Sequence, residues 1–80
     1  MASQCTVQLV IDLLHSKVGV PLDIPNLETA SWEELGVESL ALTEVCTGLE
    51  HTLGTTIPHE EALTMKNVQE LVAFANSLQA

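Results

Sequence analysis

The sequence contains no arginine and no tyrosine, and Lys17 and Lys66 are its only cationic side chains apart from three histidines. Because eleven aspartates and glutamates face these two lysines, the formal net charge of the 80 residues is −9. A surface with this charge repels a nucleic-acid backbone and an anionic membrane, so we expect neither as a partner. It attracts basic patches on other proteins, although solubility alone would also account for the acidity.

Cysteines and long apolar runs are also scarce. Cys5 and Cys46 are the only cysteines, and they lack the spacing of a metal site or of a disulfide framework. Cys46 falls on an apolar helix face, where a free thiol packs like a small hydrophobic side chain. The sequence shows no signal peptide and no apolar stretch that could span a bilayer. We therefore expect a cytoplasmic protein with reduced cysteines, and Met1 close to the first helix suggests a complete small protein.

Apolar residues are nevertheless plentiful, at 46% of the chain, and they recur at helical spacing. Their pattern predicts three main helices, at about residues 3–17, 39–53 and 68–78. Ser3 or Thr6 can cap the first helix, and Gly19 and Gly54 suit the ends of the first and second. A short third helix is expected after Pro58. Because no segment alternates like a strand, we predict an all-α four-helix bundle that forms a single domain over residues 1–80.

The connection between the first two helices is long, from about residue 20 to residue 38. A loop of this length in a small domain needs a structural reason. A short helical turn is expected at about residues 31–35. Apolar side chains are expected to pin the connection to the helices: Leu22, Ile24, Leu27, Trp32, Leu35 and Val37.

Ser39 stands at the predicted start of the second helix. Serine is a favoured N-cap, so a capping role is the plain interpretation. At about 100° per residue, however, Leu40, Glu44, Thr47 and His51 lie on the helix face opposite its apolar stripe. An exposed leucine in an acidic stripe, beside a serine at a helix N-terminus, indicates more than a cap. The N-terminus offers unpaired N–H groups and a partial positive charge, which would favour a phosphate attached to Ser39.

Catalytic interpretations are weaker. The three histidines, His15, His51 and His59, are too scattered for a zinc site. His51 and Cys46 lie on opposite faces of the second helix, so they do not form a nucleophile–base pair. Glu60 and Glu61 are adjacent and therefore point apart on a helix, which indicates a solvated helix start. A small hydrolase that uses Ser39 would lack a base and the space for a deep pocket.

Residues 35–40, which read Leu-Gly-Val-Glu-Ser-Leu, resemble the Leu-Gly-x-Asp-Ser-Leu attachment motif of the acyl carrier protein family. Glu38 stands where the family has aspartate. Further residues follow at the family's spacing after the serine: Leu49-Glu50, Gly54 and Ile57-Pro58. The resemblance therefore extends over nearly the whole chain, from the first helix to the last.

Within the family, the chain is most similar to the discrete carriers of type II polyketide synthases. This similarity lies in residues 39–42, Ser-Leu-Ala-Leu, followed by Glu44. Val37 occupies a position at which peptidyl carriers usually have a second glycine, which argues against that group. Fatty-acid carriers remain an alternative.

The resemblance implies a 4'-phosphopantetheine arm, derived from coenzyme A and attached covalently at Ser39. The chain would hold growing polyketide or acyl intermediates as thioesters on this arm and would present them to successive enzymes. It would have no catalytic activity of its own, because in group carriers the cofactor supplies the reactive group. An unmodified acidic helical adaptor that binds a basic protein is the other alternative.

The resemblance also implies which residues contact partner enzymes. They are Glu38, Leu40, Glu44 and Thr47 beside the attachment serine, with Glu60 and Glu61 as an acidic patch nearby. The expected partners are a phosphopantetheinyl transferase and enzymes of the ketosynthase and acyltransferase type that carry basic patches. The chain itself is expected to be a monomer.

Overall fold

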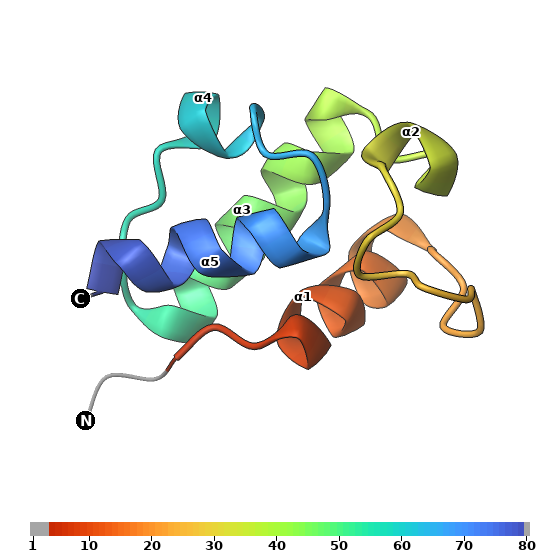
Figure 1. Ribbon diagram of the computed structural model, residues 1–80. Helices are drawn as coiled ribbons and strands as arrows, with labels where there is room; N and C mark the ends of the chain where they lie inside the picture. Colours follow the sequence, from red (N-terminus) through yellow and green to blue (C-terminus); the bar gives the residue numbers. More distant parts are fainter. Residues whose placement is uncertain (1–3, 80) are drawn as a thin grey trace.

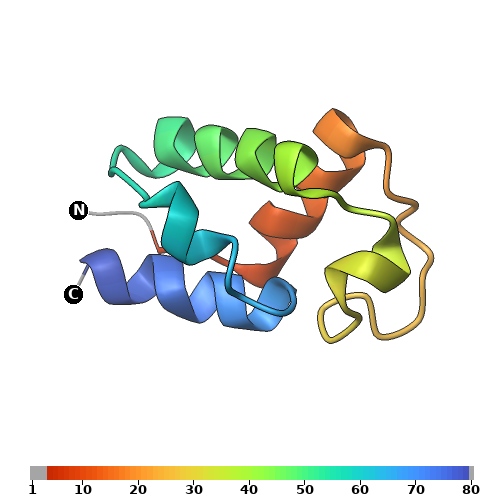
Figure 2. The same ribbon diagram turned by 90° about the horizontal axis from the view of Figure 1, so that it is seen from above.

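The computed structural model describes residues 4–79, and this part of the chain consists only of helices and loops. The elements are α1 (Val7–Leu13), η1 (Leu14–Val18), α2 (Trp32–Leu35), α3 (Ser39–Leu53), α4 (His59–Ala62) and α5 (Val68–Gln79). In Figure 1, α1 packs against both α3 and α5, and α4 packs against α3. Figure 2 shows α3 and α5 on opposite sides of the bundle, with α1 and α4 between them. The predicted all-α bundle is confirmed, and α2 is the short helical turn expected at about residues 31–35.

One apolar core joins all three main helices. Side chains that are completely buried come from each of them: Val10 and Leu14, Val45, Cys46 and Leu49, and Val68, Leu71 and Ala75. Burying each large aliphatic side chain contributes about 1.5–3 kcal/mol relative to leaving it exposed. No polar or charged residue is buried in the described part of the chain, so the core is held by apolar packing.

The first helix differs from its prediction at both ends. It begins at Val7 because Thr6 caps it, with the Thr6 Oγ1 accepting a hydrogen bond from the Leu9 N–H at 3.1 Å. Ser3, the other predicted cap, lies outside the described residues. The final turn, η1, is a π-helix, which is wider than an α-turn and is often found at functional sites. Gly19 ends it in the left-handed conformation, with φ of 85°.

Gly48 explains how η1 comes close to α3. A glycine inside a helix costs about 0.5–1 kcal/mol relative to alanine, so a buried one needs a packing reason. A Cβ atom at Gly48 would lie 2.9 Å from Leu13 Cδ2 and 3.0 Å from Lys17 Cε. The missing side chain therefore lets the end of the first helix lie directly on α3.

The long connection is fixed at several points, as its length requires. A capping box between Ser31 and Glu34 starts α2. The Trp32 indole N–H donates to the Met65 carbonyl oxygen at 2.8 Å, which ties α2 to the segment between α4 and α5. Most of the apolar residues predicted to pin the loop are buried or half-buried, but Leu22 is 54% exposed because it lies in a turn at the outer edge.

The Asn76 side chain holds the N-terminal segment against α5 by two hydrogen bonds to Cys5. Its Oδ1 accepts from the Cys5 N–H at 2.8 Å, and its Nδ2 donates to the Cys5 carbonyl oxygen at 3.0 Å. Cys5 itself is buried, so loss of these bonds would leave backbone groups poorly satisfied.

We expect Asn76→Ala to lower the free energy of unfolding by about 1–3 kcal/mol, because two hydrogen bonds to a partly buried backbone are lost. Urea unfolding followed by circular dichroism measures this change. Gln69→Ala, an exposed position on the same helix, is the matched control and should change stability by less than about 0.5 kcal/mol. Equal destabilisation by both substitutions would show that the two hydrogen bonds between Asn76 and Cys5 contribute nothing specific to stability.

Candidate functional site

Ser39 is the first residue of α3, and Glu38 occupies the N-cap position. The interpretation of Ser39 as the N-cap is therefore wrong by one position. Glu38 makes no side-chain capping hydrogen bond, since its carboxylate is longer than the short side chains that suit this role. Ser39 is hydrogen-bonded to the Thr43 side chain through its backbone oxygen and not through its hydroxyl: the oxygen accepts from Thr43 Oγ1 at 3.0 Å. The exposed Ser39 hydroxyl is thus available for chemistry.

The surroundings of Ser39 have room for an attached group. A surface hollow of about 500 Å³ is lined by Glu33, Gly36, Val37, Glu38 and Ser39. The first turn of α3 contains no acidic residue, and the N-cap Glu38 makes no side-chain hydrogen bond to its N–H groups. A phosphate ester on Ser39 would lie within the favourable field of a 15-residue helix.

The face of α3 that points away from the core is arranged as the sequence predicted. We call Leu40, Glu44, Thr47 and His51 the outer face, and all four are exposed. Leu40 is 74% exposed, although it is a large apolar side chain. An apolar side chain and a carboxylate therefore lie within two turns of Ser39, on one continuous surface.

The acidic pair on α4 also faces solvent. Glu60 and Glu61 are both exposed, and α4 packs against α3. The short helix therefore lies beside the element that carries Ser39, as Figure 2 shows. The contribution of Glu60 and Glu61 to partner binding stays a prediction.

Glu50 has a role that the sequence pattern did not predict. Its Oε2 accepts from the Ile57 backbone N–H at 2.8 Å, and its Oε1 lies 2.9 Å from His59 Nε2. Because an ionised carboxylate only accepts, the His59 Nε2 must be the donor. The two bonds fasten the loop after α3 and the start of α4 to the body of α3.

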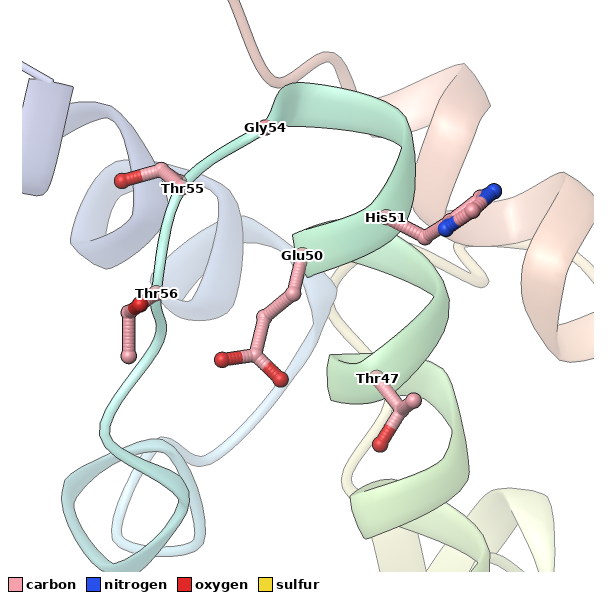
Figure 3. A pocket seen from close by; sticks show the side chains of 6 residues that line it. All are labelled: Thr47, Glu50, His51, Gly54, Thr55 and Thr56. Carbon is pink, nitrogen blue, oxygen red and sulfur yellow. The ribbon is translucent and has the colours of Figure 1, made fainter.

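Figure 3 shows this end of α3, where Glu50 points into a shallow hollow of about 440 Å³ and His51 points to another side of the helix. Thr47, Thr55 and Thr56 also line the hollow. One sequence feature could have indicated the role of Glu50. A carboxylate in the last turn of a helix is unfavourable to the helix dipole, so its presence there calls for a specific partner.

The hydrogen bond from Ile57, and secondarily that from His59, hold the pKa of Glu50 below its ordinary value. A carboxyl group with a lowered pKa stabilises the fold at pH values above its unfolded-state pKa. That contribution is lost as the pH falls through the lower folded-state pKa. We therefore expect Glu50→Gln to cost about 1 kcal/mol near pH 7, a modest value because the side chain is partly exposed.

The difference between Glu50→Gln and the unchanged protein should shrink as the pH falls toward the acidic limb of the carboxyl titration. Chemical unfolding at several pH values measures it. Glu44→Gln is the matched control, because Glu44 lies on the same helix and is exposed. A pH-independent loss in Glu50→Gln would contradict an electrostatic origin.

Neither cysteine has the properties of a nucleophile. Burial raises the pKa of the Cys5 thiol, and burial, with a smaller effect of Glu50, raises that of Cys46 to about 11. A thiol with a raised pKa is protonated at neutral pH and unreactive. Both cysteines are free and lie inside the core.

The histidines are not brought together either. His15 Nδ1 donates to the Val20 carbonyl oxygen at 3.0 Å, and His59 is bonded to Glu50. Within residues 4–79, no group of three or more metal-ligating side chains is close enough to hold an ion. No helix in the same range is long and apolar enough to cross a membrane.

A family model for the phosphopantetheine attachment site matches residues 8–75. The chain belongs to this family. The match includes Ser39 and the whole of α3. This carrier therefore uses a covalently attached 4'-phosphopantetheine, whose terminal thiol carries acyl groups, and it is not itself an enzyme.

Solved structures of acyl carrier proteins have the same fold as this carrier. The actinorhodin holo acyl carrier protein from Streptomyces coelicolor is 26% identical with a TM-score of 0.82, over 98% of this chain and 94% of that one. A 3-oxo-butyl form from the actinorhodin polyketide synthase of the same organism is 27% identical with a TM-score of 0.81, and the coverage is again 98% and 94%. An octanoyl form is 26% identical with a TM-score of 0.72, over 96% and 93% of the two chains. The predicted resemblance to carriers of polyketide synthases is confirmed.

Proposed function

We propose that Ser39 is the attachment site and that the carrier presents polyketide intermediates to the enzymes of a type II synthase. The observation that carries this proposal is the position of Ser39. Its hydroxyl is exposed at the first residue of α3 and is not used to cap the helix. It lies inside the region that matches the attachment family, and the structural relatives belong to a polyketide synthase.

The geometry suits a phosphodiester on this serine. The unpaired N–H groups and the positive end of the α3 dipole would stabilise the charge of the phosphate. Glu38, directly before Ser39, is exposed and makes no capping bond, so its carboxylate remains available to a partner. The arm would leave the domain beside the outer face and could reach enzymes that dock there.

The proposed docking surface combines apolar and acidic side chains. Leu40 would supply apolar contact, while Glu44 and the α4 carboxylates would steer and orient the approach of a basic patch. The residues proposed for partner contact are Glu38, Leu40, Glu44, Thr47, Glu60 and Glu61. The proposed partners are a phosphopantetheinyl transferase, a ketosynthase and acyltransferase-type enzymes, which a monomeric carrier would meet in the cytoplasm.

Intact-mass spectrometry after incubation with coenzyme A and a phosphopantetheinyl transferase tests the proposal. We expect the mass to increase by one phosphopantetheine. Carrier loaded from an acyl-coenzyme A, so that its arm bears an acyl thioester, is then offered separately to the ketosynthase of a type II polyketide synthase and to that of a fatty-acid synthase. Faster acyl transfer by the fatty-acid enzyme would contradict the polyketide assignment. If several transferases load neither the unchanged chain nor Glu38→Asp, the unmodified adaptor is the better hypothesis.

A further inference from the structure

One of the two lysines of this acidic chain lies at the border of the outer face. Lys17, on η1, lines a surface hollow of about 320 Å³ with Thr43, Glu44 and Thr47 of α3. A second hollow, of about 430 Å³, follows the junction of η1 and α3 and again includes Lys17 and Thr47. A cation therefore stands next to the carboxylate that we propose to guide docking.

The backbone of η1, which packs against α3, brings Lys17 to this side of the molecule. The π-helical turn carries it, and Gly48 lets its stem approach α3 closely. The Lys17 Cε would be only 3.0 Å from a Cβ at Gly48. The aliphatic stem covers the glycine, while the residue as a whole stays exposed and keeps its ammonium group in water.

The Lys17 charge is not neutralised by the carrier itself. Among residues 4–79, the ion pair that the structure contains joins His59 and Glu50, and neither Lys17 nor Glu44 takes part in it. The hollow is thus lined by a cation and a carboxylate that are not paired with each other. Two opposite charges side by side give this surface a direction, which a uniformly acidic face does not have.

We propose that Lys17 is a specificity-determining residue of the docking surface, an inference that rests on the proposed carrier function. A partner enzyme that fits would place a basic group opposite Glu44 and a carboxylate opposite Lys17. Such a partner gains an attractive contact with Lys17, whereas a uniformly basic patch is repelled by it. Without this cation, the remaining negative charge would attract basic surfaces with little discrimination.

The probe is the phosphopantetheinyl transferase that, among several tried, loads the unchanged carrier most efficiently. We expect Lys17→Met to lower kcat/KM for loading about three- to fivefold, as for one solvent-accessible charge pair, and Lys17→Glu to lower it further. Lys17→Arg should retain most of the rate, because it keeps the charge. Methionine preserves the stem over Gly48, and circular dichroism checks that each variant folds.

Lys66→Met and Lys66→Glu are the matched controls, since Lys66 is the other lysine and lies between α4 and α5. If only net charge mattered, substitutions at both lysines would speed loading by a basic partner, with glutamate the faster. Loading of Lys17→Met at or above the unchanged rate would therefore overturn this inference alone. Absence of loading of both the unchanged chain and Glu38→Asp would overturn the proposed function together with it.

A second measurement identifies the acidic residue of the transferase that pairs with Lys17. Acidic residues around the docking site of the same transferase are neutralised one at a time and combined with Lys17→Met. One substitution should abolish the rate difference between the unchanged carrier and Lys17→Met, because both members of a pair contribute to one coupling term. If Lys17→Met is slow and every transferase variant keeps the full difference, Lys17 acts within the carrier and the inference is wrong.

Discussion

Ser39→Ala is expected to abolish loading completely, because alanine has no hydroxyl oxygen with which to form the phosphodiester. Intact-mass spectrometry with coenzyme A and a transferase should show one added phosphopantetheine on the unchanged chain and none on the variant. The fold should survive, since the Ser39 hydroxyl does not cap α3 and alanine favours helix. We therefore expect a stability change within about 0.5 kcal/mol, measured by thermal unfolding.

Ser16→Ala is the matched control for this experiment, because Ser16 is another exposed serine, on η1. It should be loaded like the unchanged chain. Addition of phosphopantetheine to Ser39→Ala would place the attachment site elsewhere. If the unchanged chain is not loaded and Glu38→Asp is, the longer carboxylate at the N-cap of α3 is the obstacle, and the serine assignment stands.

Glu44→Lys is expected to lower the second-order rate constant of loading about tenfold at low ionic strength, because it reverses a charge on the face that we propose to steer association. The defect should shrink as salt rises, since exposed charges are screened over about 10 Å at 0.1 M and about 3 Å at 1 M. Leu40→Ala should also slow loading, through lost apolar contact. Its effect should depend little on salt.

Asp12→Lys on α1 is the control for net charge, because it changes the total charge by the same amount as Glu44→Lys at another exposed position. Loading rates of all three variants at low and high salt separate the effects. If Glu44→Lys and Asp12→Lys behave alike and Leu40→Ala is neutral, the outer face is only a solvated helix surface, and docking takes place elsewhere.

The sequence alone determined the class of fold and indicated Ser39 as the candidate site. Apolar residues at helical spacing located α3 and α5, and Gly19 and Gly54 marked helix ends that the structure confirms with left-handed backbone. The same periodicity placed Leu40 and Glu44 on the exposed side of α3. These are local properties, since a residue's face on a helix follows from its spacing to neighbours within a few turns.

Only the tertiary structure decided how the segments are fastened to one another. The Asn76 side chain meets Cys5 across 71 positions of the chain, and the Trp32 indole meets Met65 across 33. Glu50 also fixes the loop after its own helix, and its place in the last turn of α3 indicates that it has a partner but not which one. No local pattern encodes such pairs, because each depends on where distant backbone groups lie after the core has packed.

The position of Lys17 is also something that the sequence alone did not show, and it bears on function. Its charge is visible in the sequence, but its position beside Glu44 depends on a π-helical turn and on the space left by Gly48. The direction in which a wide final turn presents its residues, and the separation of two helices at a glycine, are set by packing against the whole core. For that reason, Ser39 could be proposed from its neighbours in sequence, while the cation beside the outer face became evident only in three dimensions.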